Sequence, residues 1–126
     1  MRSVDTNVLV RLLVRDDPQQ VEAAEVFIGK GAWVSHIVLA ETLWVLDAVY
    51  ARTAKQIASA VEKLLGHGSL TLQDAGVVDA ALDTFRANPR LGFSDCLVVE
   101  IARKAGHVPL GTFDKQLAKL KDVARP

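Results

Sequence analysis

The sequence contains one cysteine, no long apolar run and no excess of either charge. Because Cys96 has no second cysteine to pair with, an internal disulfide bond and a cysteine-based zinc site are excluded, and we expect it to be a small core residue. Arg11, Glu41 and Asp47 interrupt the longest apolar stretches before they reach the roughly 18 residues of a membrane span. A strand that begins almost at Met1 leaves no room for a signal peptide. These absences predict a soluble, cytoplasmic protein without a membrane partner.

The charges balance, since 15 basic residues face 15 acidic ones. No global field therefore attracts the chain to nucleic acid or anionic lipid, and any such partner must be held by local charge. Hydrophobic residues make up 50% of the 126 residues, which is enough for one continuous core. We predict one domain that spans residues 1–126.

Four short apolar segments alternate with helical patterns. The strand candidates are the first residues, 32–35, 70–72 and 108–110, and this alternation predicts an α/β fold with a parallel sheet covered on both faces. Capping signals at Asp17-Pro18, Ser35, Thr53 with Gln56, and Ser94 mark helix starts. The predicted helices cover 8–14, 18–28, 36 to about 50, 54–66, 74–87, 95–106 and about 114–121.

Two acids lie where helices are predicted to begin. Asp5 follows the first apolar segment, at the junction that forms the ligand side of open α/β sheets. Asp114 is predicted to open the last helix beside Thr112. Capping of free helix N–H groups would by itself explain either carboxylate.

Two further acids share helix faces with apolar residues. Glu41 lies at helical spacing from Ile37 and Trp44, where an unpaired buried charge would be unfavourable, so pairing with Arg11 is the alternative to a functional role. Asp95 shares its face with Val98, Val99 and Ala102, and we expect it to point toward the body of the protein. The solvated residues are predicted to be Glu100, Arg103, Lys104 and His107 on that helix, and Asp79 and Asp83 on the preceding one.

These four acids would repel one another strongly if they converged. Two unit charges about 4 Å apart repel by roughly 4 kcal/mol at an effective dielectric constant of 20. Such a cluster persists by taking up protons or by binding a hard cation. Oxygen ligands without histidine or cysteine suit Mg²⁺ or Mn²⁺ rather than zinc.

Each of the four acids lies in a short motif: Val-Asp-Thr-Asn at residues 4–7, Leu-Ala-Glu-Thr-Leu at 39–43, Phe-Ser-Asp-Cys-Leu at 93–97 and Gly-Thr-Phe-Asp-Lys at 111–115. The order and spacing of these motifs resemble those of the PIN-domain nucleases, and the length of the chain is most similar to the VapC-type toxins of toxin-antitoxin pairs. The resemblance covers essentially the whole chain. It implies a Rossmann-like three-layer α/β/α sandwich, with a central parallel sheet of four or five short strands in which the first and fourth strands are neighbours.

The resemblance also implies an activity, namely Mg²⁺-dependent endoribonuclease hydrolysis of RNA phosphodiester bonds by a toxin with a cognate antitoxin. It assigns one or two Mg²⁺ or Mn²⁺ ions to Asp5, Glu41, Asp95 and Asp114. It places Asn7, Ser94 and Thr112 beside these acids, where they would orient them. The apolar helices between residues 18 and 66 are expected to provide an antitoxin groove or a homodimer face.

Four cations near the motifs are candidates for contacts with RNA phosphates: Arg11, Arg15, Arg90 and Lys115. A solvated surface position is the simpler explanation for any one of them. Trp33 and Trp44 would stack on bases if exposed, but their apolar neighbours favour core packing.

Three alternatives compete with this prediction. A haloacid-dehalogenase-type phosphatase normally carries a second aspartate at the position of Asn7, which counts against that class. A non-catalytic binding module of the same fold would be expected to lose some of the four acids. A PIN-fold nuclease that acts in RNA processing without an antitoxin stays open.

Overall fold

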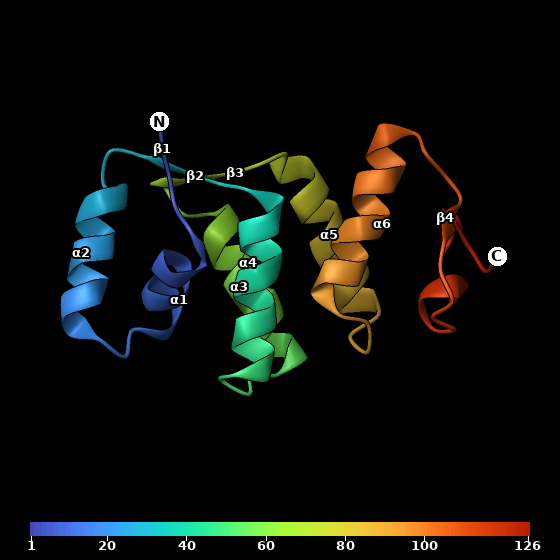
Figure 1. Ribbon diagram of the computed structural model, residues 1–126, viewed down its shortest axis with the longest axis horizontal. Helices are drawn as coiled ribbons and strands as arrows, with labels where there is room; N and C mark the ends of the chain where they lie inside the picture. Colours follow the sequence, from blue (N-terminus) through green and yellow to red (C-terminus); the bar gives the residue numbers. More distant parts are fainter. The chain divides into compact units, whose positions relative to one another are not determined.

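The structure is a computed structural model that describes residues 1–126. The chain forms two compact units, unit 1 (Met1–Ala75) and unit 2 (Gly76–Pro126). Figure 1 colours the chain from its N-terminus to its C-terminus and labels α1–α6 and β1–β4.

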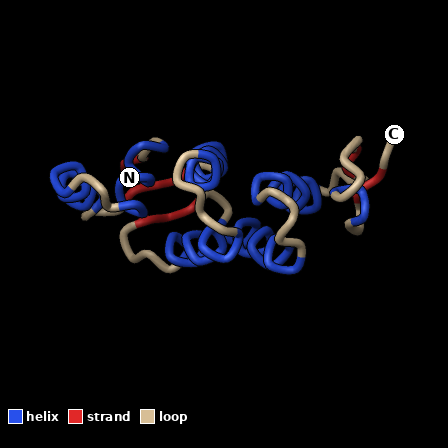
Figure 2. The backbone as a smooth tube through the Cα atoms, turned by 90° about the horizontal axis from the view of Figure 1, so that it is seen from below, coloured by secondary structure: helices blue, strands red, loops and turns tan.

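Unit 1 contains a parallel sheet of three strands and four helices. The strands are β1 (Arg2–Ser3), β2 (Ala32–Val34) and β3 (Leu70–Leu72), in the order β1-β2-β3, with Ser3 opposite Trp33 and Trp33 opposite Thr71. The helices are α1 (Thr6–Val14), α2 (Pro18–Ile28), α3 (His36–Ala48) and α4 (Ala54–Leu65). Figure 2 shows how short the strands are beside these helices.

The predicted capping signals of unit 1 are confirmed. The Asp17 and Ser35 side chains accept hydrogen bonds from the third residues of α2 and α3, at 3.1 Å in both cases. Thr53 and Gln56 form a reciprocal capping box at the start of α4, with bonds of 3.2 and 2.9 Å. These local bonds explain why the helix starts follow so closely from the sequence.

The core of unit 1 lies where α1 packs against α2 and α3, and where α4 packs against β3. Its largest side chains with almost no exposed surface are Leu9, Ile28, Val34, Leu39 and Val61. The second and third strands each bury their first and last residues and expose the middle one. Trp33 is that exposed middle residue in β2, so the prediction that it packs in the core is wrong.

Unit 2 contains α5 (Ala75–Ala87, which begins at the unit boundary), α6 (Phe93–Ala105) and a small C-terminal subdomain. The subdomain consists of β4 (Leu110–Gly111), a 3₁₀ helix, η1 (Leu117–Lys119), and β5 (Val123–Ala124), which pairs with β4 in parallel. Phe85 and Phe93 pack edge to face between α5 and α6, with ring centroids 5.8 Å apart. Gly106 ends α6 in the left-handed conformation, as its sequence position predicts.

Three predictions for unit 2 are wrong in detail. Gly92, not Ser94, is the N-cap of α6, and Ser94 lies in its first turn. The fourth strand begins at Leu110, after Pro109 rather than across it, because proline has no N–H to donate to a ladder. In place of a helix over 114–121 there is a turn followed by the short η1.

The α/β class with parallel strands is confirmed, and the small number of strands is compatible with the prediction. The strands form a three-stranded sheet in unit 1 and a two-stranded sheet in unit 2. The expectation that the first and fourth strands are neighbours is wrong, because β1 pairs with β2 and β4 pairs with β5. No helix has the length and apolar character needed to cross a membrane.

Candidate active site

Asp5 connects the sheet of unit 1 to α1. The backbone N–H of Val4 bonds to the Trp33 carbonyl at 3.2 Å, so the chain stays beside β2 up to the residue before the acid. The Asp5 Oδ1 atom accepts the Val8 N–H at 3.2 Å, and the residue has the extended backbone of an N-cap. Capping is therefore confirmed, but it uses only Oδ1 and leaves Oδ2 of this exposed carboxylate available to a ligand.

Glu41 lies on the exposed side of α3, and the expectation that its face is buried is wrong. Ile37 and Trp44, its neighbours on this face, are 79% and 63% exposed. The buried face of α3 consists instead of Leu39, Thr42, Leu43 and Leu46. The Glu41 carboxylate has neither a hydrogen bond nor a salt bridge, and the residue is exposed.

The alternative pairing of Glu41 with Arg11 is also wrong. The Arg11 guanidinium forms an ion pair with Asp16 and donates a 2.8 Å hydrogen bond to the Tyr50 hydroxyl. Arg11 therefore links the end of α1 to the end of α3 and leaves Glu41 without a cation.

Asp95 lies in the first turn of α6 and is partly buried, in agreement with its predicted inward direction. Burial raises the pKa of its carboxyl group, and the nearby charge of Asp114 raises it further. Asp95 forms no salt bridge that would compensate for these two effects. Unit 2 therefore holds a pair of acids that repel each other and lack a basic partner.

Asp114 is held in place by a turn. Its Oδ1 atom accepts the N–H groups of Gln116 at 2.8 Å and Leu117 at 3.2 Å. Its own N–H donates to the Thr112 hydroxyl at 3.0 Å. As in Asp5, the backbone bonds use Oδ1 and leave Oδ2 free.

The residues predicted to orient the acids differ in what they contact. Thr112 holds the backbone of Asp114, whereas Asn7 and Ser94 are exposed and form no side-chain hydrogen bond. The roles of Asn7 and Ser94 stay predictions.

The four candidate cations fall into two pairs. Arg11 and Arg15 are engaged, since Arg15 forms a 2.8 Å ion pair with Glu25. Arg90 and Lys115, which flank the Asp95 and Asp114 motifs in the sequence, are exposed and have no acidic partner. The second pair is therefore the better placed for contact with a phosphate.

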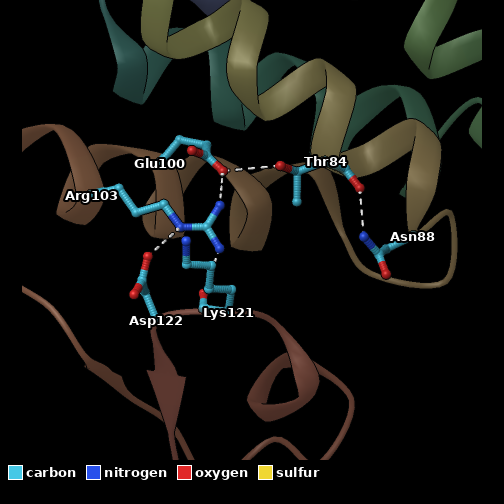
Figure 3. Close-up of polar contacts among 6 residues, drawn as sticks. All are labelled: Thr84, Asn88, Glu100, Arg103, Lys121 and Asp122. Atoms are coloured by element: carbon cyan, nitrogen blue, oxygen red, sulfur yellow. Dashed lines mark hydrogen bonds and ion pairs between the residues drawn. The ribbon is translucent and has the colours of Figure 1, made fainter.

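Sequence reasoning missed a buried ionic group in unit 2, because Glu100 was assigned to the solvated face of α6. Glu100 is only 8% exposed and accepts bonds from the Thr84 hydroxyl at 2.9 Å and from Arg103 Nη1 at 2.7 Å (Figure 3). Glu100 lies four residues after Cys96 and three after Leu97, which are both buried. This helical spacing indicates that Glu100 shares their buried face.

Cys96 is fully buried in α6, as predicted. Burial raises the pKa of its thiol to about 11, with further contributions from the charges of Asp95 and Glu100. The thiolate is therefore scarce near neutral pH, and Cys96 is a core residue rather than a nucleophile.

Comparison with known families identifies the chain. The sequence model of the PIN domain matches residues 3–123. The chain belongs to the PIN-domain family. PIN domains are typically metal-dependent nucleases that act on RNA or DNA. No curated protein and no solved structure matches this PIN domain.

The acids of this PIN domain have the chemistry of a site for a divalent cation. Neither unit alone gathers three or more acids, histidines or cysteines at metal-binding distance. In unit 2, burial and the nearby charge of Asp114 raise the pKa of Asp95, and neither carboxylate forms a salt bridge. Oxygen donors with excess negative charge fit Mg²⁺ or Mn²⁺.

Proposed function

We propose that this PIN domain is a Mg²⁺-dependent endoribonuclease and the toxin of a toxin-antitoxin pair. The observation that carries the proposal is the partly buried Asp95 carboxylate, whose pKa is raised by burial and by the nearby charge of Asp114, while neither acid has a basic partner. A bound divalent cation would attract both carboxylates. Membership of a family of metal-dependent nucleases supports the same assignment.

The proposed site takes Asp5 and Glu41 from unit 1 and Asp95 and Asp114 from unit 2, and it requires the four acids to converge around one or two Mg²⁺ or Mn²⁺ ions. The cation, when bound, lowers the pKa of water and stabilises charge on the phosphate and leaving oxygen. A carboxylate of the site accepts the proton of the attacking water. Arg90 and Lys115 hold phosphates of the substrate, because they are exposed and unpaired.

RNA is the proposed substrate because the motifs are most similar to those of VapC-type toxins. Large exposed apolar side chains support a protein partner as well, since Val26 is 75% exposed on α2, and Ile37 and Trp44 are exposed on α3. We propose that the cognate antitoxin, or a second copy of the chain in a homodimer, covers these side chains. Growth arrest on expression, relieved by co-expression of a small reading frame beside the gene, would test the antitoxin.

Cleavage of single-stranded RNA tests the enzymatic proposal. We expect the purified protein to cut a labelled RNA with Mg²⁺ or Mn²⁺, and to lose activity in EDTA. Asp5→Asn and Asp95→Asn should each reduce the rate by more than roughly 100-fold, because even residues that only orient a metal ligand contribute about 10- to 100-fold. Asp83→Asn is the matched control, since Asp83 is exposed on α5 and belongs to no motif.

Three outcomes would contradict the enzymatic proposal. Equal cleavage with and without EDTA would exclude the metal. Full activity of Asp95→Asn, with circular dichroism showing a folded protein, would exclude the Asp95–Asp114 pair from catalysis. A protein that binds RNA with high affinity but never cuts it would be a binding module.

A further inference from the structure

The guanidinium of Arg103 connects α6 to the C-terminal subdomain of unit 2. Its Nη1 atom donates to Glu100, its Nη2 atom donates to the backbone carbonyl of Lys121, and its Nε atom lies 3.4 Å from Asp122 Oδ2 (Figure 3). The Asp122 contact is an ion pair, and two of these three partners belong to the segment just before β5. Arg103 therefore joins α6 to the C-terminal subdomain, to which Asp114 belongs.

The α6 side of this connection is held by a network of hydrogen bonds. Glu100 is buried and also accepts a hydrogen bond from the Thr84 hydroxyl on α5. Asn88 donates to the Thr84 carbonyl at 2.9 Å and ties the end of α5 into the same group. Because a buried carboxylate needs both donors, the Arg103 side chain has little freedom to leave.

On the other side, backbone hydrogen bonds lead from Asp122 to Asp114. The Leu110 N–H donates to the Asp122 carbonyl at 2.8 Å, and the Thr112 N–H donates to the Ala124 carbonyl at 3.0 Å. The Thr112 hydroxyl then accepts the N–H of Asp114. A chain of direct contacts therefore runs from Arg103 to the acid.

Arg103 and Asp95 lie on the same helix, eight residues or about 12 Å apart along its axis. Asp114 belongs to the C-terminal subdomain, so its position relative to Asp95 depends on how that subdomain is held on α6. The Arg103 contacts with Lys121 and Asp122 hold it on this helix.

We propose that Arg103 is a positioning residue, which fixes the C-terminal subdomain on α6 so that Asp114 stays within reach of the cation that Asp95 binds. The part of the inference that concerns the cation rests on the proposed function. The contacts of Arg103 with Glu100, Lys121 and Asp122, here called the tether, do not depend on it. Arg103 contacts neither acid and acts only through the subdomain.

The test compares Mn²⁺ affinity across matched variants by titration calorimetry. Arg103→Lys keeps the charge beside Glu100 but loses the planar guanidinium that contacts three residues at once. The double variant Arg103→Gln with Glu100→Gln removes the tether without leaving a buried unpaired charge. The control is Lys104→Gln, the exposed neighbouring residue, which has no partner.

We expect Mn²⁺ affinity to fall about tenfold in both tether variants and to be unchanged in the control, by analogy with other groups that orient metal ligands. The rate of RNA cleavage should recover at saturating metal, because the ligands themselves are intact. Wild-type affinity in a folded Arg103→Lys protein and a folded double variant would overturn the proposal.

Hydrogen exchange of the metal-free protein provides a second, independent measurement. The amides of Leu110 and Thr112 should exchange faster in the tether variants, while amides in the middle of α6 keep their protection. Unchanged exchange at these two amides would also overturn the tether. If the wild-type protein binds no Mn²⁺, the proposed function fails, and the exchange result alone decides whether Arg103 holds the subdomain.

Discussion

At the scale of the residue, capping and metal binding are compatible roles for a carboxylate. Asp5 caps α1 and Asp114 closes a turn. In both carboxylates, Oδ1 accepts all the hydrogen bonds that come from backbone N–H groups. These bonds fix the rotamer and leave Oδ2 free. The sequence predicted the cap at Asp5 because capping is local, whereas the turn at Asp114 was mistaken for a helix start because both begin with the same residue types.

Asp95 makes the stability of the metal-free protein depend on pH. Its pKa is raised in the folded state by burial and by Asp114, so the folded protein holds the carboxyl proton more tightly than the unfolded chain does. The stabilisation from this bound proton is complete below the unfolded-state pKa and is lost as pH rises through the folded-state pKa. We expect Asp95→Asn, which stays neutral, to unfold at higher urea concentration than wild type at pH 7 in EDTA. The advantage should shrink on acidification to about pH 4, near the ordinary pKa of aspartate. A clear loss of stability in the variant at pH 7 would assign Asp95 a structural role instead.

For the helices, the sequence predicted where a helix with a side-chain cap begins and ends better than it predicted which face of the helix is buried. The boundaries of α2 and α4 match the capping signals, because each cap is a bond within four residues. On α3, apolar residues occupy both faces, with Leu39, Leu43 and Leu46 on one and Ile37 and Trp44 on the other. Periodicity cannot decide which of two apolar faces is buried, so Glu41 was assigned to the wrong environment.

Two adjacent residues of α3 test its orientation directly. Leu43 is 3% exposed and Trp44 is 63% exposed. Leu43→Ala should lower the free energy of unfolding by about 2–5 kcal/mol, the usual result of truncating a core leucine. Trp44→Ala should change it by no more than about 0.5 kcal/mol, as expected for a surface position. Urea denaturation of both variants gives the comparison, and a loss of several kcal/mol at Trp44 would show that this face of α3 is buried in solution.

At the scale of the whole molecule, the sequence predicted parts better than it predicted their assembly. Strands of two residues, such as β4 and β5, are too short to carry a periodic pattern, so β5 was not located. The idea that four acids meet in one site came from the family resemblance, because convergence of residues more than 100 positions apart depends on contacts that local patterns do not encode. That idea still requires a test that involves both units.

Thermal stabilisation by metal provides this test. If Asp5 of unit 1 and Asp95 of unit 2 bind the same cation, Mg²⁺ at 100 times its dissociation constant should stabilise the folded chain by about 2.7 kcal/mol. For a chain of this length the melting temperature should then rise by roughly 8–15 °C, since each kcal/mol corresponds to a few degrees. Asp5→Asn and Asp95→Asn should each abolish most of this rise, although they change different units. A rise that survives Asp5→Asn but not Asp95→Asn would confine the metal to unit 2 and would contradict a site built from both.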